Sequence, residues 1–281
     1  MARVRYARSL RDLEAADGAR RTADEGGVRL VRCRYETDPE AVAAVVPRPL
    51  EAAPACEVEV LLGAPLAGEA STAGAPLAGE ASTAGASLEG ETPAAGALIG
   101  VRVDYDGAAG LMPLVVPCAD PAAVVAGRER FGEPRKRADV DVRVSGEDVS
   151  AEIARRGVSF LRVSGRFDGA LAPAEWSGAS FSFKAFPAAD PGKSFDHDPQ
   201  LVRSDWRFVS RSARRLAGGL ELWDSPFDPI ADLPVRRLVG LEYAEGRWTR
   251  AARVLRPVPG DWLRPFLHQR DDAPGTEGVD V

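Results

Sequence analysis

Three lysines are the residues best suited to covalent chemistry with a carbonyl compound, because arginine supplies the other positive charges of this chain. Lys136, Lys184 and Lys193 are the lysines among 36 basic residues. A neutral amine attacks a ketone to form an imine, whereas a guanidinium stays protonated and cannot. Lys136 stands between Arg135 and Arg137, and neighbouring positive charges disfavour a protonated ammonium. The alternative is that Lys136 is a solvated charge in an exposed basic run.

The other polar candidates are weaker. Lys184 shares a predicted strand face with Ser182, so it is either a second amine near a pocket or one half of a buried ion pair. His197 lies between two aspartates, a spacing found at metal sites, but a solvated loop explains it equally well. The glycine-rich stretch lacks the strand, helix and lysine of a phosphate-binding loop. We therefore predict no metal and no organic cofactor.

Composition limits the partners. The 281 residues carry a net charge of −6 with a pI near 5.2, so binding to nucleic acid is not expected. No apolar run reaches the roughly 18 residues of a membrane-spanning helix, and the first residues lack a secretory signal. The three cysteines are widely spaced, which indicates a reduced compartment without disulfides. We predict a cytoplasmic protein that does not interact with membranes.

An internal repeat interrupts the chain. The sequence APLAGEASTAG at 64–74 recurs unchanged at 75–85 and decays at 86–96. Its small residues, glycines and prolines bury too little surface to offset the cost of ordering. We predict one domain over 28–270, interrupted by this low-complexity insertion at 64–96, with an N-terminal extension at 1–27 and a flexible tail at 271–281.

The rest of the chain reads mainly as strands. Alternating or continuous apolar residues predict strands at 28–35, 56–62, 97–105, 110–117, 138–144, 148–154, 158–166, 179–186, 201–213 and 219–223. Asp38-Pro39 and Asp120-Pro121 each open a short helix, the second ending near Gly132. Glu245-Gly246 predicts a last hairpin. Many antiparallel strands with few helices indicate an α+β protein built on a closed or nearly closed barrel.

Four stretches resemble the acetoacetate decarboxylase superfamily and follow its order along the chain. They are YETDPEAVAAVVPRPLE at 35–51, DPAAVVAGRERFGEPRK at 120–136, FSFKAFP at 181–187 and DPIADLPV at 228–235. The first is similar to the family's helix and Val-Pro-x-Pro-Leu turn, and the second to its Gly-Arg-Glu helix and Pro-Lys-Lys turn. The resemblance covers about 28–257 and implies a cone-shaped β-barrel, predominantly antiparallel, with an enclosed pocket and peripheral helices.

The resemblance also implies which residues line the pocket. Pro134 sets a register in which Arg135 stands at the Schiff-base lysine and Lys136 at the second family lysine. Glu59 matches one of the family's pocket glutamates. The family's first-strand arginine falls at Val28, with Arg29 beside it. Its other glutamate falls near Ala94, inside the repeat, where Glu89 or Glu91 is the alternative. The decarboxylase signature is therefore broken, and acetoacetate itself is not expected to be the substrate.

Each implied role has a structural alternative. Arg135 is either a clamp for a substrate carboxylate or one half of a salt bridge with Glu129, Glu133 or Glu59. Glu59 is either a general acid or base or the partner of that arginine. We expect Glu59 to pair with Arg135 in the empty protein.

The sequence thus predicts an acetoacetate decarboxylase-like, lyase-type enzyme. The resemblance makes aldol, dehydration, cyclisation or decarboxylation chemistry on an oxo acid or polyketide-like carbonyl compound the expected activity, in secondary metabolism. Arg135, Lys136 and Glu59 are the candidate catalytic residues, and Arg29, Arg135 and Lys184 the candidate substrate-binding residues. The rival prediction is a non-catalytic protein that retains the pocket for binding a small molecule. A homo-oligomer is expected from the resemblance alone.

Overall fold

The computed structural model describes residues 27–66, 95–173 and 175–270. Its strands are β1 (Val28–Glu36), β2 (Glu51–Ala52), β3 (Glu57–Pro65), β4 (Gly96–Tyr105), β5 (Ala108–Cys118), β6 (Arg135–Arg137), β7 (Asp139–Ser145), β8 (Asp148–Arg155), β9 (Val158–Leu171), β10 (Glu175–Lys184), β11 (Gln200–Leu222) and β12 (Arg237–Pro257). Its helical segments are α2 (Pro39–Val45), α3 (Pro121–Ala126), η1 (Gly127–Phe131), η2 (Ile230–Asp232), α4 (Gly260–Leu263) and η3 (Arg264–Arg270).

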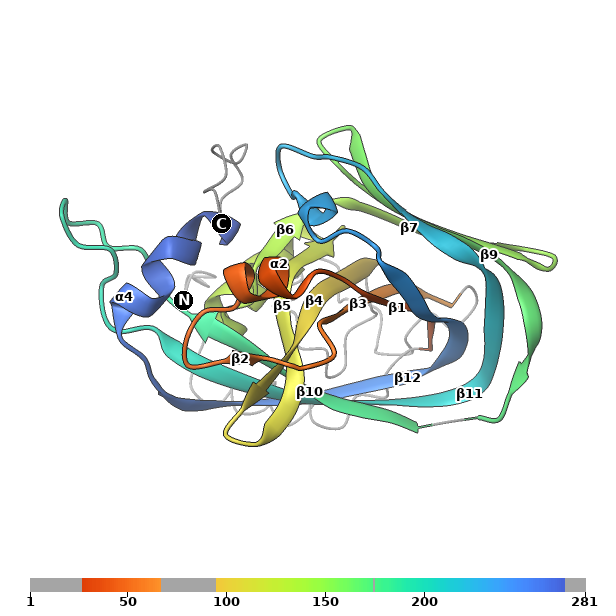
Figure 1. The fold of residues 1–281 in the computed structure, drawn as a ribbon, viewed down its shortest axis with the longest axis horizontal. Coiled ribbons are helices and arrows are strands. Elements are labelled where there is room, and N and C mark those ends of the chain that lie inside the picture. Colours follow the sequence, from red (N-terminus) through yellow and green to blue (C-terminus); the bar gives the residue numbers. More distant parts are fainter. Residues whose placement is uncertain (1–26, 67–94, 174, 271–281) are drawn as a thin grey trace, which may run out of the picture.

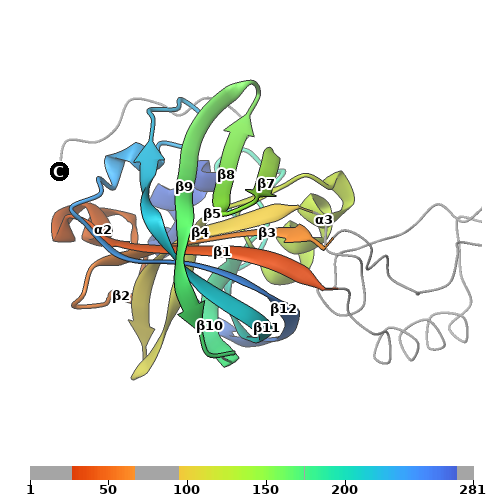
Figure 2. The ribbon, with the colours of Figure 1, turned by 90° about the vertical axis from the view of Figure 1, so that its right-hand side faces the viewer.

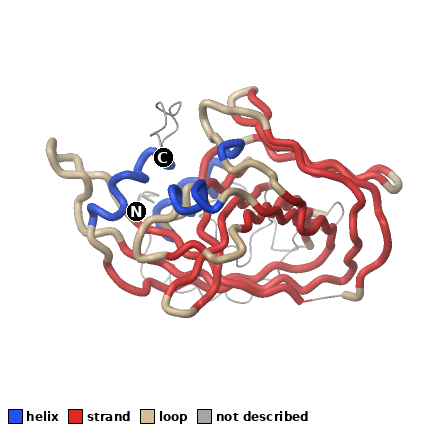
Figure 3. The backbone as a smooth tube through the Cα atoms, in the orientation of Figure 1, coloured by secondary structure: helices blue, strands red, loops and turns tan. Residues whose placement is uncertain are grey.

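Seven of the strands form a closed barrel (Figures 1 and 3). Their order is β10-β5-β4-β3-β1-β12-β11, and β11 pairs with β10 to complete the ring. All pairings in the ring are antiparallel except that between β5 and β10, where Ser180 lies beside Leu111. The predicted fold class, a largely antiparallel barrel with a few short helices, is confirmed.

Long strands continue past the barrel and turn back over it. The far half of β11 pairs with β9, and β8 and β7 follow to make a second sheet. This sheet lies over the outer face of β1, β3 and β4 (Figure 2), and β7 contacts β3 and β5. Within the described residues, the second sheet therefore covers the barrel wall on this side and leaves the wall bare along β11 and β12.

Alternation along the bare wall identifies the interior. Val209 and Arg247 are exposed, whereas Phe208 and Ala244 on the other face of the same strands are buried. In a closed barrel the buried face of such strands is the inside. The Phe208 face, which includes Leu30 of β1, is therefore the barrel interior.

Most of the apolar core lies outside the barrel, between its wall and the second sheet. Val60 and Val101 of the wall belong to the same buried cluster as Val142, Ile153 and Val163 of the outer sheet. This two-sided burial explains why β5 is apolar throughout, whereas β3 begins with an alternation of glutamate and valine. The interior holds the polar and aromatic side chains of the wall together with a few aliphatic ones.

Two predicted breaks do not occur. The strands expected at 201–213 and 219–223 are one strand, β11, and the hairpin predicted at Glu245-Gly246 is wrong because β12 runs straight through it. Gly218 and Gly246 allow close contact with neighbouring strands and do not form turns. A side chain on Gly246 would meet the Phe208 ring and the Val209 carbonyl, and one on Gly218 would meet the backbone of Ser164 in β9.

Smaller departures concern the ends of elements. The helix opened by Asp120, whose carboxylate accepts from the Ala122 amide at 2.9 Å, changes into the π-helix η1 and ends at Gly132 with φ +70°. The short strand β6 had no counterpart among the predicted strands. The repeat lies outside the described residues except at its ends, where 64 and 65 complete β3 and 96 begins β4.

The crossing of β9 and β11 gives a stability test. Gly218→Ala is expected to lower the free energy of unfolding by about 1–3 kcal/mol, because the new methyl group would overlap Ser164 backbone. Gly219→Ala is the matched control, since a side chain there meets open space, and its effect should stay within about 0.5 kcal/mol. Urea unfolding compares the two. Equal stabilities would show that the close approach does not exist in solution.

Candidate functional site

Arg135 lies inside the barrel, enclosed by the helical segment that follows β5. Its strand, β6, pairs Arg135 with Val116, whose chain neighbour Val115 faces the outer core. Arg135 Nε donates to Glu133 Oε2 at 2.7 Å, and Nη1 donates to the Ala123 carbonyl at 3.1 Å. The side chain is 7% exposed. It is therefore held on one side by a carboxylate and on the other by the α3 backbone.

Glu133 is the centre of this first ion cluster. Its second oxygen, Oε1, lies 2.6 Å from Nη1 of Arg250, which also donates to the Ser204 hydroxyl at 2.6 Å. Burial alone would raise the pKa of Glu133, but the positive charges of Arg250 and Arg135 outweigh it and lower that pKa. The expected pairing of Arg135 with Glu59 is wrong. Glu133, one of the three alternatives considered, is the partner.

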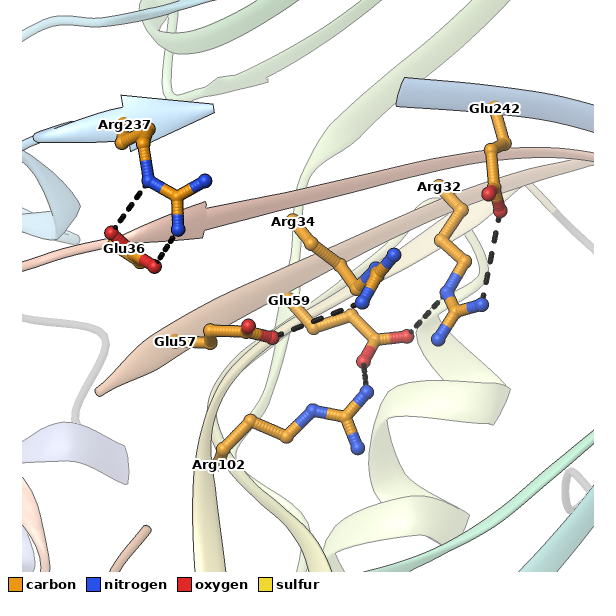
Figure 4. A network of polar contacts seen from close by, with 8 residues as sticks. All are labelled: Arg32, Arg34, Glu36, Glu57, Glu59, Arg102, Arg237 and Glu242. Carbon is orange, nitrogen blue, oxygen red and sulfur yellow. Dashed lines mark hydrogen bonds and ion pairs between the residues drawn. The ribbon is translucent and has the colours of Figure 1, made fainter. Parts of the chain in front are cut away.

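Glu59 is the centre of a second, separate ion cluster. It is fully buried on β3, and Arg32 Nε donates to its Oε1 at 2.8 Å. Arg102 Nη2 donates to its other oxygen, and Figure 4 shows the two guanidinium groups meeting the carboxylate from different sides. Arg32 Nη1 also lies 3.8 Å from Glu242 Oε2. Glu59 therefore holds two arginines from two neighbouring strands.

The sequence did not single out Arg102, although a signal for it was present. It is a charged residue within β4, between Val101 and Val103, which are both fully buried. Alternation along this strand turns Arg102 away from that apolar face and toward the interior. The strand pairing gives the same orientation. Gly100 is paired with Glu59, and Arg102, two residues further along β4, lies on the same face.

An aromatic wall completes the interior. It consists of Trp176 stacked on Phe208, with ring centroids 5.4 Å apart, and Trp206 stacked on Trp248 at 5.0 Å. The Arg32 guanidinium lies 5.2 Å from the centroid of the Trp176 ring, which joins this wall to the Glu59 cluster. The buried Nε1 of Trp248 has no hydrogen-bond acceptor among the residues that the structure describes. A donor without a partner in such a place favours a ligand that carries oxygen.

A cavity of about 330 Å³ opens at the rim of β11 and β12. It lies at the bulge in β11, where Ser210 and Gly246 continue the faces of Phe208 and Trp248. Val209, Arg211 and Arg247 also line it. None of its lining residues belongs to the two ion clusters or to the aromatic wall, so this cavity is separate from both.

Lys136 points the opposite way from Arg135. Its Nζ donates to Asp228 Oδ1 at 2.8 Å and to the Phe227 carbonyl at 3.3 Å, and Arg155 of β8 donates to Asp228 Oδ2 at 3.0 Å. Lys136 therefore lies in the layer between barrel and outer sheet. It is 4% exposed, so the alternative of a solvated charge is wrong. Its predicted role as a nucleophile remains a prediction.

The other predicted residues lie apart from both clusters. Arg29 is paired across the ladder with Glu245, on the outer face of β1, where its positive charge acts on Tyr243. Lys184 ends β10, with Nζ 5.9 Å from the centroid of the Phe186 ring, and no ion pair of Lys184 occurs among the described residues. Their substrate-binding roles remain predictions.

Two further observations concern metals and membranes. Within 27–66, 95–173 and 175–270, no three His, Cys, Asp or Glu side chains are grouped so that they could hold a metal ion. The ring centroids of His197 and Phe186 lie 6.0 Å apart. No helix in the described part of the chain has the length and apolar character needed to span a membrane.

The closed seven-stranded barrel with its outer sheet defines the class of this protein, and known proteins share the fold. The family model described as acetoacetate decarboxylase matches residues 16–258. This chain belongs to the acetoacetate decarboxylase family. No curated protein matches it.

Several solved structures share the fold at low sequence identity. An acetoacetate decarboxylase from Legionella pneumophila is 18% identical, with a TM-score of 0.66 over 84% of this chain and 90% of that one. A second acetoacetate decarboxylase structure is 17% identical, with a TM-score of 0.67 over 83% and 88%. The enduracididine biosynthesis enzyme MppR, solved in complex with pyruvate, is 15% identical, with a TM-score of 0.60 over 82% and 89%.

Glu133→Gln tests the first ion cluster. The change leaves two buried guanidinium groups facing a neutral amide, so we expect the free energy of unfolding near neutral pH to fall by about 3–5 kcal/mol. Because the pKa of Glu133 is lowered by folding, its contribution is present above the unfolded-state pKa, about 4.3, and is lost as the pH falls through the folded-state value. The difference in the free energy of unfolding between wild type and Glu133→Gln should therefore become smaller at acid pH.

Urea unfolding between neutral and acid pH provides the measurement. The matched control is Glu129→Gln, which changes an exposed glutamate of η1, the helical segment that precedes Glu133, and should have little effect. A Glu133→Gln difference that is independent of pH, or no larger than that of Glu129→Gln, would contradict the geometry.

Proposed function

We propose that this protein is a small-molecule enzyme that takes an oxo acid or a related carbonyl compound into the barrel and acts on it in a lyase-type reaction. The reaction would not pass through an imine at residue 135. The observation that carries this proposal is the enclosed guanidinium of Arg135, since a guanidinium in this position is charged and not nucleophilic. It favours chemistry in which positive charge stabilises an anion.

The first step that fits these residues is enolisation. A base takes a proton from the carbon beside the ketone, the electron pair of the broken C–H bond forms a carbon–carbon double bond, and the π pair of the carbonyl moves onto its oxygen. Fixed cations in a site with little water stabilise such an oxyanion strongly. We assign this stabilisation to Arg135, supported by its burial and its fixed contacts with Glu133 and the Ala123 carbonyl.

Which residue accepts the proton is a separate part of the proposal. Glu59 was predicted to move protons, and it lies in the interior, but both of its oxygens already accept from guanidinium groups. These contacts support more directly a role in holding Arg32 and Arg102. Proton transfer by Glu59 remains a prediction.

The nature of the substrate rests on analogy with relatives. MppR, which shares the fold, is described in complex with pyruvate and with the condensation product of pyruvate and imidazole 4-carboxaldehyde. Pyruvate is a small 2-oxo acid. We carry over to this chain only the class of compound, and with it a role in secondary metabolism.

A second candidate function is binding without turnover. Both family lysine positions hold cations tied into buried ion pairs, Arg135 with Glu133 and Lys136 with Asp228. This arrangement fits a protein that kept the pocket and lost the covalent step. The two candidates differ in whether a bound oxo acid exchanges its C–H protons.

One experiment separates the possibilities. Wild-type protein is incubated in heavy water with pyruvate and with larger 2-oxo acids, and loss of the protons beside the ketone is followed by NMR. Parallel samples are treated with borohydride and mapped by mass spectrometry. We expect catalysed proton exchange, no borohydride adduct on any lysine, and no release of carbon dioxide from acetoacetate above background.

Arg135→Lys is the control that shows that trapping works, because an amine at this position should give an adduct mapped to residue 135. An adduct on Lys136 in the wild type would overturn the non-imine proposal. Binding of the oxo acids without any exchange would favour the binding protein.

A further inference from the structure

Arg102, on the interior face of β4, is an arginine with hydrogen-bond donors that no group in the described residues accepts from. Building on the proposed function, we infer that Arg102 binds the carboxylate of the substrate. Its guanidinium is joined to the protein through one nitrogen, Nη2, which donates to Glu59. Its Nε is buried and has no acceptor. Arg102 thus carries hydrogen-bond donors with nothing in the described chain to receive them.

The other interior arginines are more completely engaged. Arg135 is fixed by Glu133 and the Ala123 carbonyl, and its Nε lies against Gly127 so closely that a side chain there would overlap it. Arg32 donates to Glu59, approaches Glu242 and covers the Trp176 ring.

The exposed fractions of the arginine side chains also favour Arg102 as the ligand-binding residue. The Arg102 side chain is 29% exposed, against 14% for Arg32 and 7% for Arg135. Figure 4 shows the third nitrogen of Arg102 on the side of the group away from Glu59. Glu59 itself is fully buried. The Arg102 guanidinium therefore contacts a fully buried carboxylate while part of its side chain remains accessible.

This geometry suits a carboxylate rather than a neutral carbonyl. A guanidinium presents pairs of parallel N–H groups that match the two oxygens of a carboxylate, which an amide or ester does not. Glu59 orients the group in advance, which reduces the ordering cost when a ligand binds. A lysine in place of Arg102 would keep the charge near Glu59 and lose the paired donors. Arg102 therefore selects acids over neutral analogues.

Calorimetry with pyruvate, phenylpyruvate and pyruvamide tests this inference. Wild type should bind the two acids more tightly than the amide. Arg102→Met should weaken the acids about ten- to a hundredfold, the effect of losing a hydrogen bond to a charged group, and leave the amide nearly unchanged. Arg102→Lys keeps a cation beside Glu59, so it serves as the second variant if Arg102→Met folds poorly. It should recover part of the affinity for the acids. The control is Arg253→Met, which removes an arginine from the bare outer face of β12.

The outcomes distinguish this inference from the proposed function. If the acids bind wild type and bind Arg102→Met and Arg102→Lys equally tightly, the carboxylate lies elsewhere and the inference is wrong while the proposed function stands. If wild type binds the acids no better than the amide, Arg102 is likewise not the anchor. If wild type binds none of the three compounds, both the inference and the proposed substrate class are wrong.

Discussion

The barrel closes around charged side chains, and the arrangement of its interior follows from the need to pair each of them. Taking a carboxylate and a guanidinium out of water costs several kcal/mol each, and removing one partner of a buried pair is strongly destabilising. Glu133 meets this need for Arg135 and Arg250, and Glu59 meets it for Arg32 and Arg102. These pairings determine which positive charge is fixed and which remains accessible to a ligand.

The alternation of a β-strand divides two neighbouring cations between two environments. Arg135 enters the barrel, whereas Lys136 turns into the layer beneath the outer sheet and meets Asp228 and Arg155. The one amine of the Arg-Lys-Arg run is thereby withdrawn from the interior. The chain keeps the family's fold, but residue 135, where the resemblance places the Schiff-base lysine, has no amine that could form an imine.

Residues whose environment is local were predicted well from sequence, and residues whose environment depends on distant strands were not. The Asp120-Pro121 helix start, the strand around Cys33 and the opposite orientations of Arg135 and Lys136 follow from local pattern and were found in the structure. Arg135 is an exception, since its partner Glu133 lies only two residues away, and Glu59 was expected there because a sequence does not show that Arg32 and Arg102 already occupy Glu59. Gly246 was read as a turn since a sequence does not show that another strand passes against it.

The account requires that an oxo acid sits in the barrel as a free carbonyl compound, held by Arg102 and close to a fixed Arg135. A crystal structure of the protein with pyruvate or phenylpyruvate bound tests this most directly. The account predicts a ligand carboxylate within hydrogen-bonding distance of Arg102, Glu133 still between Arg135 and Arg250, and no covalent link to the protein. Continuous electron density between the ligand and a lysine side chain, or a ligand carboxylate that replaces Glu133 on Arg135, would contradict it.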